Sequence, residues 1–320
     1  MSTPPFRLTR EVLAALVAVE RLIGRLEGLS VPRPEPRLRR KNRVRTVRGS
    51  VSIEGNTLSV DQVTALLDGK RVVGPPREVQ EVKNAIDAYE LAPRLRIGSR
   101  VDLLEAHALM MRGLVPDAGR FRSGSVGIVH GERVVHLAPP AGRVPELMDH
   151  LLKWLRTSSD PEVVKAIVTH YELVFIHPFS DGNGRIARLW QHAALLRVSS
   201  AFAYAPVESV IRERQARYYA AIRRSNLAGY STAFLAFSLG ALRQALEELL
   251  EDFRPEPVSP ERRLVVARAN LGRGWFTRAD YLRLWKTITP ITASRDLQRG
   301  TLAGALQRRG ERRLAEYRFR

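Results

Sequence analysis

Twelve consecutive residues hold most of the side chains in this chain that could do chemistry. Positions 177–188 read His-Pro-Phe-Ser-Asp-Gly-Asn-Gly-Arg-Ile-Ala-Arg. An imidazole such as His177 can take a proton from a hydroxyl group at neutral pH. A carboxylate such as Asp181 suits Mg²⁺, and guanidinium groups such as Arg185 and Arg188 bind phosphate oxygens. The stretch therefore predicts a site that handles a phosphorylated ligand.

Two helices are expected to position this stretch. Residues 161–176 carry apolar side chains at helical spacing, and a second helical pattern runs over 186–198. The motif then forms a tight loop, in which Gly182, Asn183 and Gly184 open the second helix. Backbone N–H groups at a helix N-terminus bind anions, so we expect these three residues to face the α- and β-phosphates, with the Asn183 amide adding a donor.

Each of these residues also has a purely structural interpretation. His177 could be a histidine without a role, and Asp181 could cap the second helix. Arg185 and Arg188 could form surface ion pairs. The concentration of all four residue types within one loop favours the functional interpretation.

The twelve residues resemble the complete signature of the Fic family, HPFx[D/E]GNGRxxR, without a departure. The resemblance implies an all-helical fold that transfers AMP from ATP to a hydroxyl group of a protein side chain, with ATP and Mg²⁺ bound at the loop. It also implies roles for the residues: His177 is the base, Asp181 the metal ligand, and Arg185 and Arg188 the phosphate arginines.

Two further segments match the same family. Residues 126–137 are β-branched runs around a glycine turn, which indicates a β-hairpin. After Gly-Arg-Phe-Arg at 119–122, the resemblance makes this hairpin, about 125–137, a flap that holds the target segment by strand addition. The alternative is a plain structural hairpin. Tyr219 and Asn226 resemble the family's adenine pocket, whereas a tyrosine in a helix core is the competing interpretation.

An upstream segment resembles the family's inhibitory motif, [S/T]xxxE[G/N]. It runs from Ser50 to Glu54 and Gly55. A glutamate at this point could pair with Arg188 and leave the γ-phosphate without its partner. The alternative is a solvated glutamate at a helix end. In some inhibited family members the same glutamate supports removal of AMP, so reversal of the reaction is also open here.

The net charge of +19 is concentrated in two places. Residues 258–320 hold 15 Lys and Arg against 5 Asp and Glu, and residues 31–48 hold 8 against one. The first cluster coincides with segments that resemble a winged helix-turn-helix domain, with Thr-Ala-Ser-Arg-Asp-Leu at 292–297 and a wing at 310–318. Nucleic-acid binding is expected from such a basic module, and protein contacts or dimerisation are the alternative.

Other features of the composition bear on the cellular compartment in which the protein works. The chain has no cysteine, and its first ten residues lack the apolar core of a signal peptide. No stretch approaches the roughly 20 apolar residues that span a bilayer. We therefore expect a cytoplasmic protein without membrane contact.

These observations predict an all-α Fic-type bundle with a β-hairpin flap and a C-terminal winged-helix domain. We expect an N-terminal helical region at 1–99 with an inhibitory helix at about 37–56, a core at 100–253, a linker at 254–260 and the winged helix at 261–320. Single helices are expected at 209–225 and 231–253. The expected function is adenylyl transfer to a Ser, Thr or Tyr hydroxyl, restrained by Glu54, in a homodimer. The alternative is a DNA-binding regulator that uses the Fic domain as a nucleotide sensor.

Overall fold

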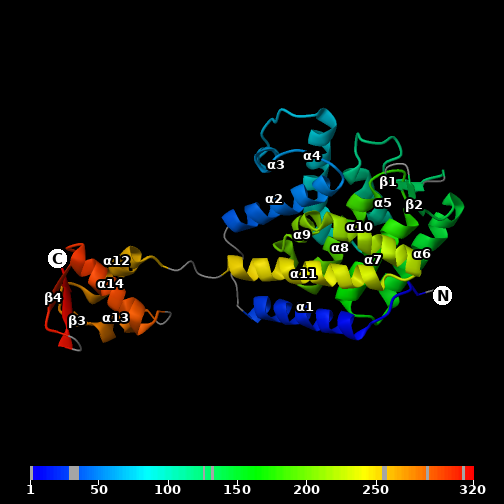
Figure 1. Cartoon of the computed structure of the whole chain (residues 1–320). Helices are drawn as coiled ribbons and strands as arrows, with labels where there is room; N and C mark the ends of the chain where they lie inside the picture. The colour runs from blue at the N-terminus through cyan, green and yellow to red at the C-terminus, as the bar shows by residue number, and fades with distance from the viewer. Residues whose placement is uncertain are drawn as a thin grey trace. The chain divides into compact units, whose positions relative to one another are not determined.

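The computed structural model describes residues 3–28, 36–124, 127–130, 133–253, 258–285, 288–311 and 314–320. The chain divides into two compact units, Met1–Phe253 and Arg254–Arg320 (Figure 1). The first unit contains the helices α1 (Arg10–Gly28), α2 (Pro36–Ile53), α3 (Val60–Leu67), α4 (Pro76–Leu91), α5 (Arg100–Met110), α6 (Val144–Thr157), α7 (Glu162–Ile176), α8 (Asn183–Val198), α9 (Val207–Glu213), α10 (Gln215–Ala228) and α11 (Thr232–Asp252). It also contains the 3₁₀ turns η1 (Ala92–Arg94), η2 (Ala141–Arg143) and η3 (Ser200–Ala203) and the strands β1 (Gly127–His130) and β2 (Arg133–Leu137).

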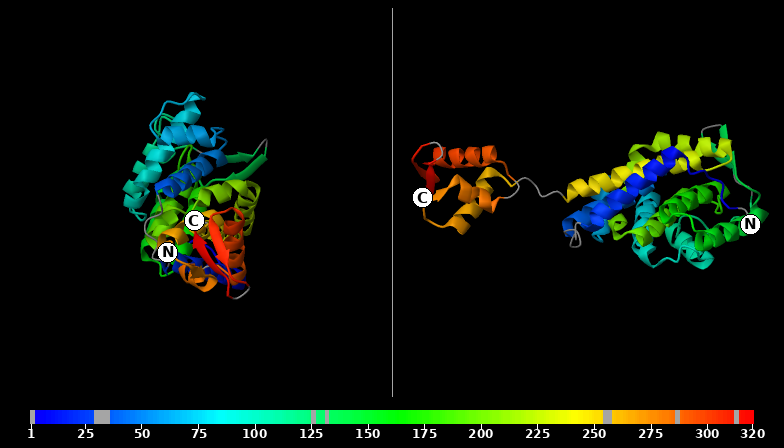
Figure 2. Two further views of the ribbon diagram at one scale, coloured as in Figure 1. Left: turned by 90° about the vertical axis from the view of Figure 1, so that its left-hand side faces the viewer. Right: turned by 90° about the horizontal axis from the view of Figure 1, so that it is seen from below.

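One hydrophobic core runs through the whole first unit. It extends from Val12 on α1 to Leu249 on α11, so the predicted regions 1–99 and 100–253 share it. The helices α7 and α8 lie at its centre and have few exposed positions. The helices α1 and α11 pack side by side at one face (Figure 2). Buried helices of this kind give a rigid frame for the loop that joins α7 to α8.

Two features of the helices differ from the sequence-based expectation. The helix expected at 209–225 is two helices, α9 and α10, which break at Arg214. No proline or glycine marks this break, so no helix-breaking residue signals it in the sequence. The helix α14 begins at Pro290, because the Thr289 side chain caps it by accepting from the Thr292 N–H, so it starts two residues before the segment 292–297.

The expected hairpin is present in its described part. The strands β1 and β2 pair antiparallel, with Gly127 opposite Leu137 and His130 opposite Arg133. The register shifts between Ile128 and Val129, which is a β-bulge. Residues 125, 126, 131 and 132 of the predicted flap lie outside the described residues.

The second unit contains α12 (Pro260–Leu271), β3 (Phe276–Thr277), α13 (Arg278–Leu284), α14 (Pro290–Leu302), β4 (Leu306–Arg309) and β5 (Glu316–Phe319). Its strands form an antiparallel sheet in the order β3-β5-β4. In its core, Asp296 accepts two bonds from Arg263, at 2.6 and 2.8 Å, and one from Tyr281. The winged-helix assignment stays a prediction, and four residues of the expected linker, 254–257, lie outside the described part.

Within the described part of the chain, no helix has the length and apolar character needed to cross a membrane.

Candidate functional site

The loop between α7 and α8 begins with an unusual backbone conformation at His177. This residue has φ 51° and ψ 59°, and it is the only non-glycine residue with positive φ among those described. Its N–H bonds to the Leu173 carbonyl at 3.1 Å, which ends α7, and Pro178 then prevents the helix from continuing. The His177 ring is half-buried, with Nδ1 3.4 Å from the Val174 carbonyl. A proton on Nδ1 would leave Nε2 as the acceptor.

A second residue, Arg122, anchors the His177 backbone. Its Nε donates to the His177 carbonyl at 2.7 Å, and its backbone N–H donates to the Pro178 carbonyl. Its other guanidinium nitrogens bond to the carbonyls of Gly124 and Pro139, which flank the hairpin. Burial lowers the pKa of Arg122. One buried arginine therefore ties the two ends of the hairpin segment to the loop that carries His177.

The middle of the loop is fixed from inside by Asn183. Its side-chain oxygen accepts from the Phe179 N–H, and its amide nitrogen donates to the Phe179 carbonyl, both at 2.9 Å. The Asn183 side chain is buried, so its amide holds the loop closed. In this arrangement the amide bonds to the loop itself, whereas the sequence suggested that it would add a donor to the phosphates.

A stacked pair of rings, from Phe179 and His107, supports the loop. The Phe179 ring lies parallel to the His107 ring, with centroids 3.6 Å apart. His107 Nδ1 accepts from the Gly119 N–H, so Nε2 donates to the Asp181 carbonyl at 3.0 Å. Burial lowers the pKa of His107, which keeps this ring neutral. The histidine thus positions the Asp181 backbone.

The carboxylate of Asp181 lies at the N-terminus of α8. Its Oδ1 accepts from the Gly182 N–H at 2.5 Å and from Arg185 Nη2 at 3.1 Å, and its Oδ2 accepts from Arg77 at 3.4 Å. Among the described residues, no group of three His, Asp or Glu side chains could hold a metal. A single half-exposed carboxylate still fits Mg²⁺, because this ion keeps several waters and takes its other ligands from phosphates.

The second arginine, Arg188, is fully buried beneath α2. Its Nη2 donates to Glu54 Oε1 at 2.6 Å and to the Ser50 carbonyl at 3.0 Å, and its Nε donates to Ser50 Oγ at 3.3 Å. Among the described residues, its Nη1 has no hydrogen-bond partner. Burial acts to lower the pKa of Arg188, but the Glu54 carboxylate and two tyrosines raise it beyond that effect. The guanidinium is therefore charged and paired with the carboxylate that the sequence suggested.

The Glu54 carboxylate also covers the first turn of α8. A Cβ atom at Gly184 would overlap Glu54 Oε1, so the carboxylate rests directly on this glycine. The first turn of a helix exposes N–H groups that attract anions. Glu54 thus places an anionic group where the loop would hold a phosphate.

The two residues expected to bind adenine lie on one helix, α10. Tyr218 is buried, whereas the Tyr219 side chain is partly exposed and donates from its hydroxyl to the Ile53 carbonyl at 3.3 Å. Asn226 accepts from the Tyr171 hydroxyl at 2.8 Å. Tyr219 therefore lies against the end of α2, next to Glu54, and its role in adenine binding stays a prediction.

Three residues of the site were not assigned a role from the sequence. Arg122 lies in the Gly-Arg-Phe-Arg segment at 119–122, which the resemblance places before the flap without a role for this arginine, and no motif includes His107. The third, Glu81 on α4, contacts Arg185 Nη1 at 3.3 Å across 104 residues of sequence. Local sequence patterns do not reveal such distant contacts.

Comparisons with known proteins agree on one family. The model of the Fic/DOC family matches residues 98–195. A solved Fic family protein from Desulfovibrio desulfuricans G20 is 39% identical, with a TM-score of 0.74, over 100% of this chain and 98% of that one. A solved fragment of Fic-1 from Caenorhabditis elegans is 25% identical, with a TM-score of 0.62, over 76% of this chain and 72% of that one.

Curated relatives carry the name protein adenylyltransferase. The fic-1 protein of Caenorhabditis elegans is 30% identical over 226 residues, which are 63% of this chain and 42% of the relative. The Fic protein of Drosophila erecta is 33% identical over 189 residues, which are 55% and 36% of the two chains. The chain therefore spans about half the length of these relatives or less.

Proposed function

The chain belongs to the Fic family, and from this membership and the geometry of the loop we propose that it is a protein adenylyltransferase restrained by Glu54. The observation that carries the proposal is the position of the Glu54 carboxylate, on Gly184 and 2.6 Å from Arg188. A carboxylate held by a phosphate-binding arginine at a helix N-terminus stands in for the phosphate itself.

His177 acts as the general base in this reaction. Its ring nitrogen takes the proton of a Ser, Thr or Tyr hydroxyl, and the oxygen attacks the α-phosphorus of ATP. The bond between the α-phosphorus and the bridging oxygen breaks, and pyrophosphate leaves. The bonds from Arg122 and to Leu173 keep the His177 backbone in its left-handed conformation, so the imidazole stays at the mouth of the loop.

The N-terminus of α8 binds the phosphates. The backbone N–H groups from Gly182 to Gly184 face the α- and β-phosphates, while Arg185 and Arg188 take the oxygens of the leaving group. Asp181 would hold Mg²⁺, which when bound offsets the charge of the phosphates. Tyr219 and Asn226 would hold the adenine.

Glu54 restrains the reaction because it competes with ATP for Arg188. While the ion pair is closed, the γ-phosphate finds neither the guanidinium nor the space above Gly184. Removal of AMP from a modified protein by the same site also stays open with this glutamate present. In that reaction a water molecule, instead of pyrophosphate, attacks the phosphorus of the attached AMP.

Labelled ATP tests the proposal. The unmodified protein, the Glu54→Gly variant and the Glu54→Gly/His177→Ala double variant are incubated with a cell lysate and ATP labelled at the α- or the γ-phosphate. Adenylyl transfer predicts α-label on protein with the Glu54→Gly variant alone and no γ-label with any form. Label from the γ-phosphate would indicate phosphate transfer and refute the proposal, as would α-label that survives the loss of His177.

The second unit supports a further proposal, DNA binding. The exposed side chains of α14 include Arg295, Gln298 and Arg299, which are types that contact base edges and phosphates. A gel shift with DNA from upstream of the protein's own gene tests it. The complex should form with the whole chain and vanish when Arg295 and Arg299 are both replaced by alanine. An unchanged shift would contradict a role for α14.

A further inference from the structure

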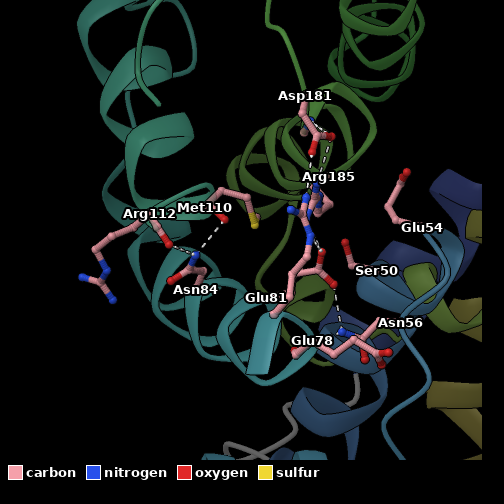
Figure 3. Close-up of polar contacts among 12 residues, drawn as sticks. Ser50, Glu54, Asn56, Glu78, Glu81, Asn84, Met110, Arg112, Asp181 and Arg185 are labelled. Atoms are coloured by element: carbon pink, nitrogen blue, oxygen red, sulfur yellow. Dashed lines mark hydrogen bonds and ion pairs between the residues drawn. The ribbon is translucent and has the colours of Figure 1, made fainter. Parts of the chain in front are cut away.

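The guanidinium of Arg185 lies between two carboxylates. Its Nη2 donates to Asp181 Oδ1 at 3.1 Å, and its Nη1 donates to Glu81 Oε1 at 3.3 Å. The Arg185 and Glu81 side chains are 5% and 13% exposed, whereas Asp181 is 42% exposed. Charges in such a buried place interact more strongly than they do in water. Figure 3 shows these three side chains in one continuous line of contacts.

The Glu81 carboxylate is itself held in place. The Asn56 amide donates to Glu81 Oε2 at 3.0 Å and also to the Glu78 carbonyl. One turn further along α4, Asn84 donates to the carbonyls of Met110 and Arg112 at the end of α5 (Figure 3). These bonds fix α4 against its neighbours, so Glu81 presents its carboxylate to Arg185 from a rigid helix.

We propose that Glu81 is a positioning residue that shares Arg185 with Asp181 and thereby keeps Asp181 available to a divalent cation. The inference rests on the proposed function, in which Asp181 meets Mg²⁺ and ATP. Asp181 already has two arginines next to it, Arg185 and Arg77. A cation is repelled by such neighbours unless another carboxylate takes part of their charge.

Loss of the Glu81 charge has two effects that act in the same direction. The Arg185 charge is no longer offset, and both ends of its guanidinium can turn to Asp181. The cation then meets more positive charge and a ligand that is already occupied. The phosphates of ATP, in contrast, are attracted by the Arg185 charge that Glu81 no longer offsets.

The same contacts connect the metal ligand to the inhibitory segment. Asn56 follows Glu54 by two residues, so this short segment reaches Arg188 through Glu54 and Arg185 through Asn56 and Glu81. An Asn56→Ala substitution therefore should repeat the effect of losing Glu81 in a weaker form, because the Glu81 carboxylate loses one bond but keeps its charge.

Binding of a fluorescent, non-hydrolysable ATP analogue tests the proposal without relying on activity. The dissociation constant of the analogue is measured for the Glu54→Gly form, once with excess Mg²⁺ and once with EDTA. The ratio of the EDTA value to the Mg²⁺ value gives the factor by which the metal strengthens binding. We expect Glu81→Gln to reduce this ratio about tenfold, the effect that changes around a metal ligand typically have. The affinity in EDTA should be unchanged or higher. Glu81→Asp, which keeps the charge, should restore part of the ratio.

Glu90→Gln is the matched control, because it removes the same charge from the far end of α4, where Glu90 pairs with Arg43. It should leave the ratio unchanged. A Glu81→Gln ratio equal to that of the parent would overturn the proposal. An equal loss of affinity with and without metal would also overturn it, since that result indicates damage to the fold. Failure of the Glu54→Gly parent to bind the analogue would instead overturn the proposed function.

Discussion

The ion pair of Glu54 and Arg188 predicts a stability change that nucleotide should reverse. Arg188 is 1% exposed, and Glu54 is its only carboxylate partner in the described part of the chain. In the Glu54→Gln variant the amide oxygen can still accept from Arg188, but the buried charge loses its counter-charge. Hydrogen bonds to charged groups contribute about 1 kcal/mol more than neutral ones, and an uncompensated buried charge adds to the loss.

Because Glu54 is about one-third exposed, we place the total loss at the low end, about 1–2 kcal/mol. For a unit of this size, that loss lowers the melting temperature by about 2–8 °C. Mg-ATP should more than restore it, because ligand at about 100 times its dissociation constant adds about 2.7 kcal/mol. The γ-phosphate would then supply the missing negative charge.

Differential scanning fluorimetry of the unmodified protein and Glu54→Gln, with and without Mg-ATP, measures both effects. Glu20→Gln on α1 serves as the control, because Glu20 is exposed and does not contact Arg188 in the described part of the chain. It should change neither value by more than about 0.5 kcal/mol. Equal melting temperatures without nucleotide, or equal shifts with it, would refute the inference that Glu54 and a phosphate compete for one guanidinium.

Three further predictions concern stability. Burial raises the pKa of Glu208 to about 7, so the protonated acid stabilises the fold at low pH, and this stability is lost as the pH rises from about 4.5 through 7. Glu208→Gln should therefore raise the melting temperature at pH 8 and leave it nearly unchanged at pH 4. An equal shift of the melting temperature at both pH values would contradict this. Gly182→Ala should lower the free energy of unfolding in urea by at least about 1–2 kcal/mol, because φ is +80° and the new Cβ would lie 2.5 Å from Met111 Sδ. An unchanged free energy of unfolding would contradict this and show that the loop relaxes. Asp296→Asn should destabilise the second unit by about 3 kcal/mol, since it leaves the buried Arg263 charge unpaired, and a second unit that melts normally by calorimetry would contradict that value.

The sequence predicted the local features of this protein well. Apolar spacing located α7, because a buried helix must present apolar side chains on most of its faces. The residue types at 177–188 indicated the chemistry, because few structural needs require a base, a carboxylate and two arginines together. The break at Arg214 was missed, since no proline or glycine lies near it to mark the end of α9.

Contacts across long stretches of sequence could be predicted only where the family resemblance supplied them, as it did for Glu54 and Arg188. An amide such as Asn183 can bond to a ligand or to the backbone, and only the folded loop shows that both ends of its amide meet Phe179. Glu81 has an ordinary place on an amphipathic helix. Its contact with Arg185 exists because α4 packs beside the loop, and a single sequence does not encode that proximity in any local pattern.

We infer a competent adenylyl-transfer site that Glu54 holds in check. The decisive measurement is the rate of pyrophosphate release, together with the AMP attached to protein, in the unmodified protein, Glu54→Gly and Glu54→Gly/His177→Ala. We expect a rate at least about tenfold higher in Glu54→Gly, one pyrophosphate for each AMP attached, and a fall of about 10²–10⁴-fold when the base is lost. A Glu54→Gly variant no faster than the unmodified protein, or one whose rate is independent of His177, would contradict it.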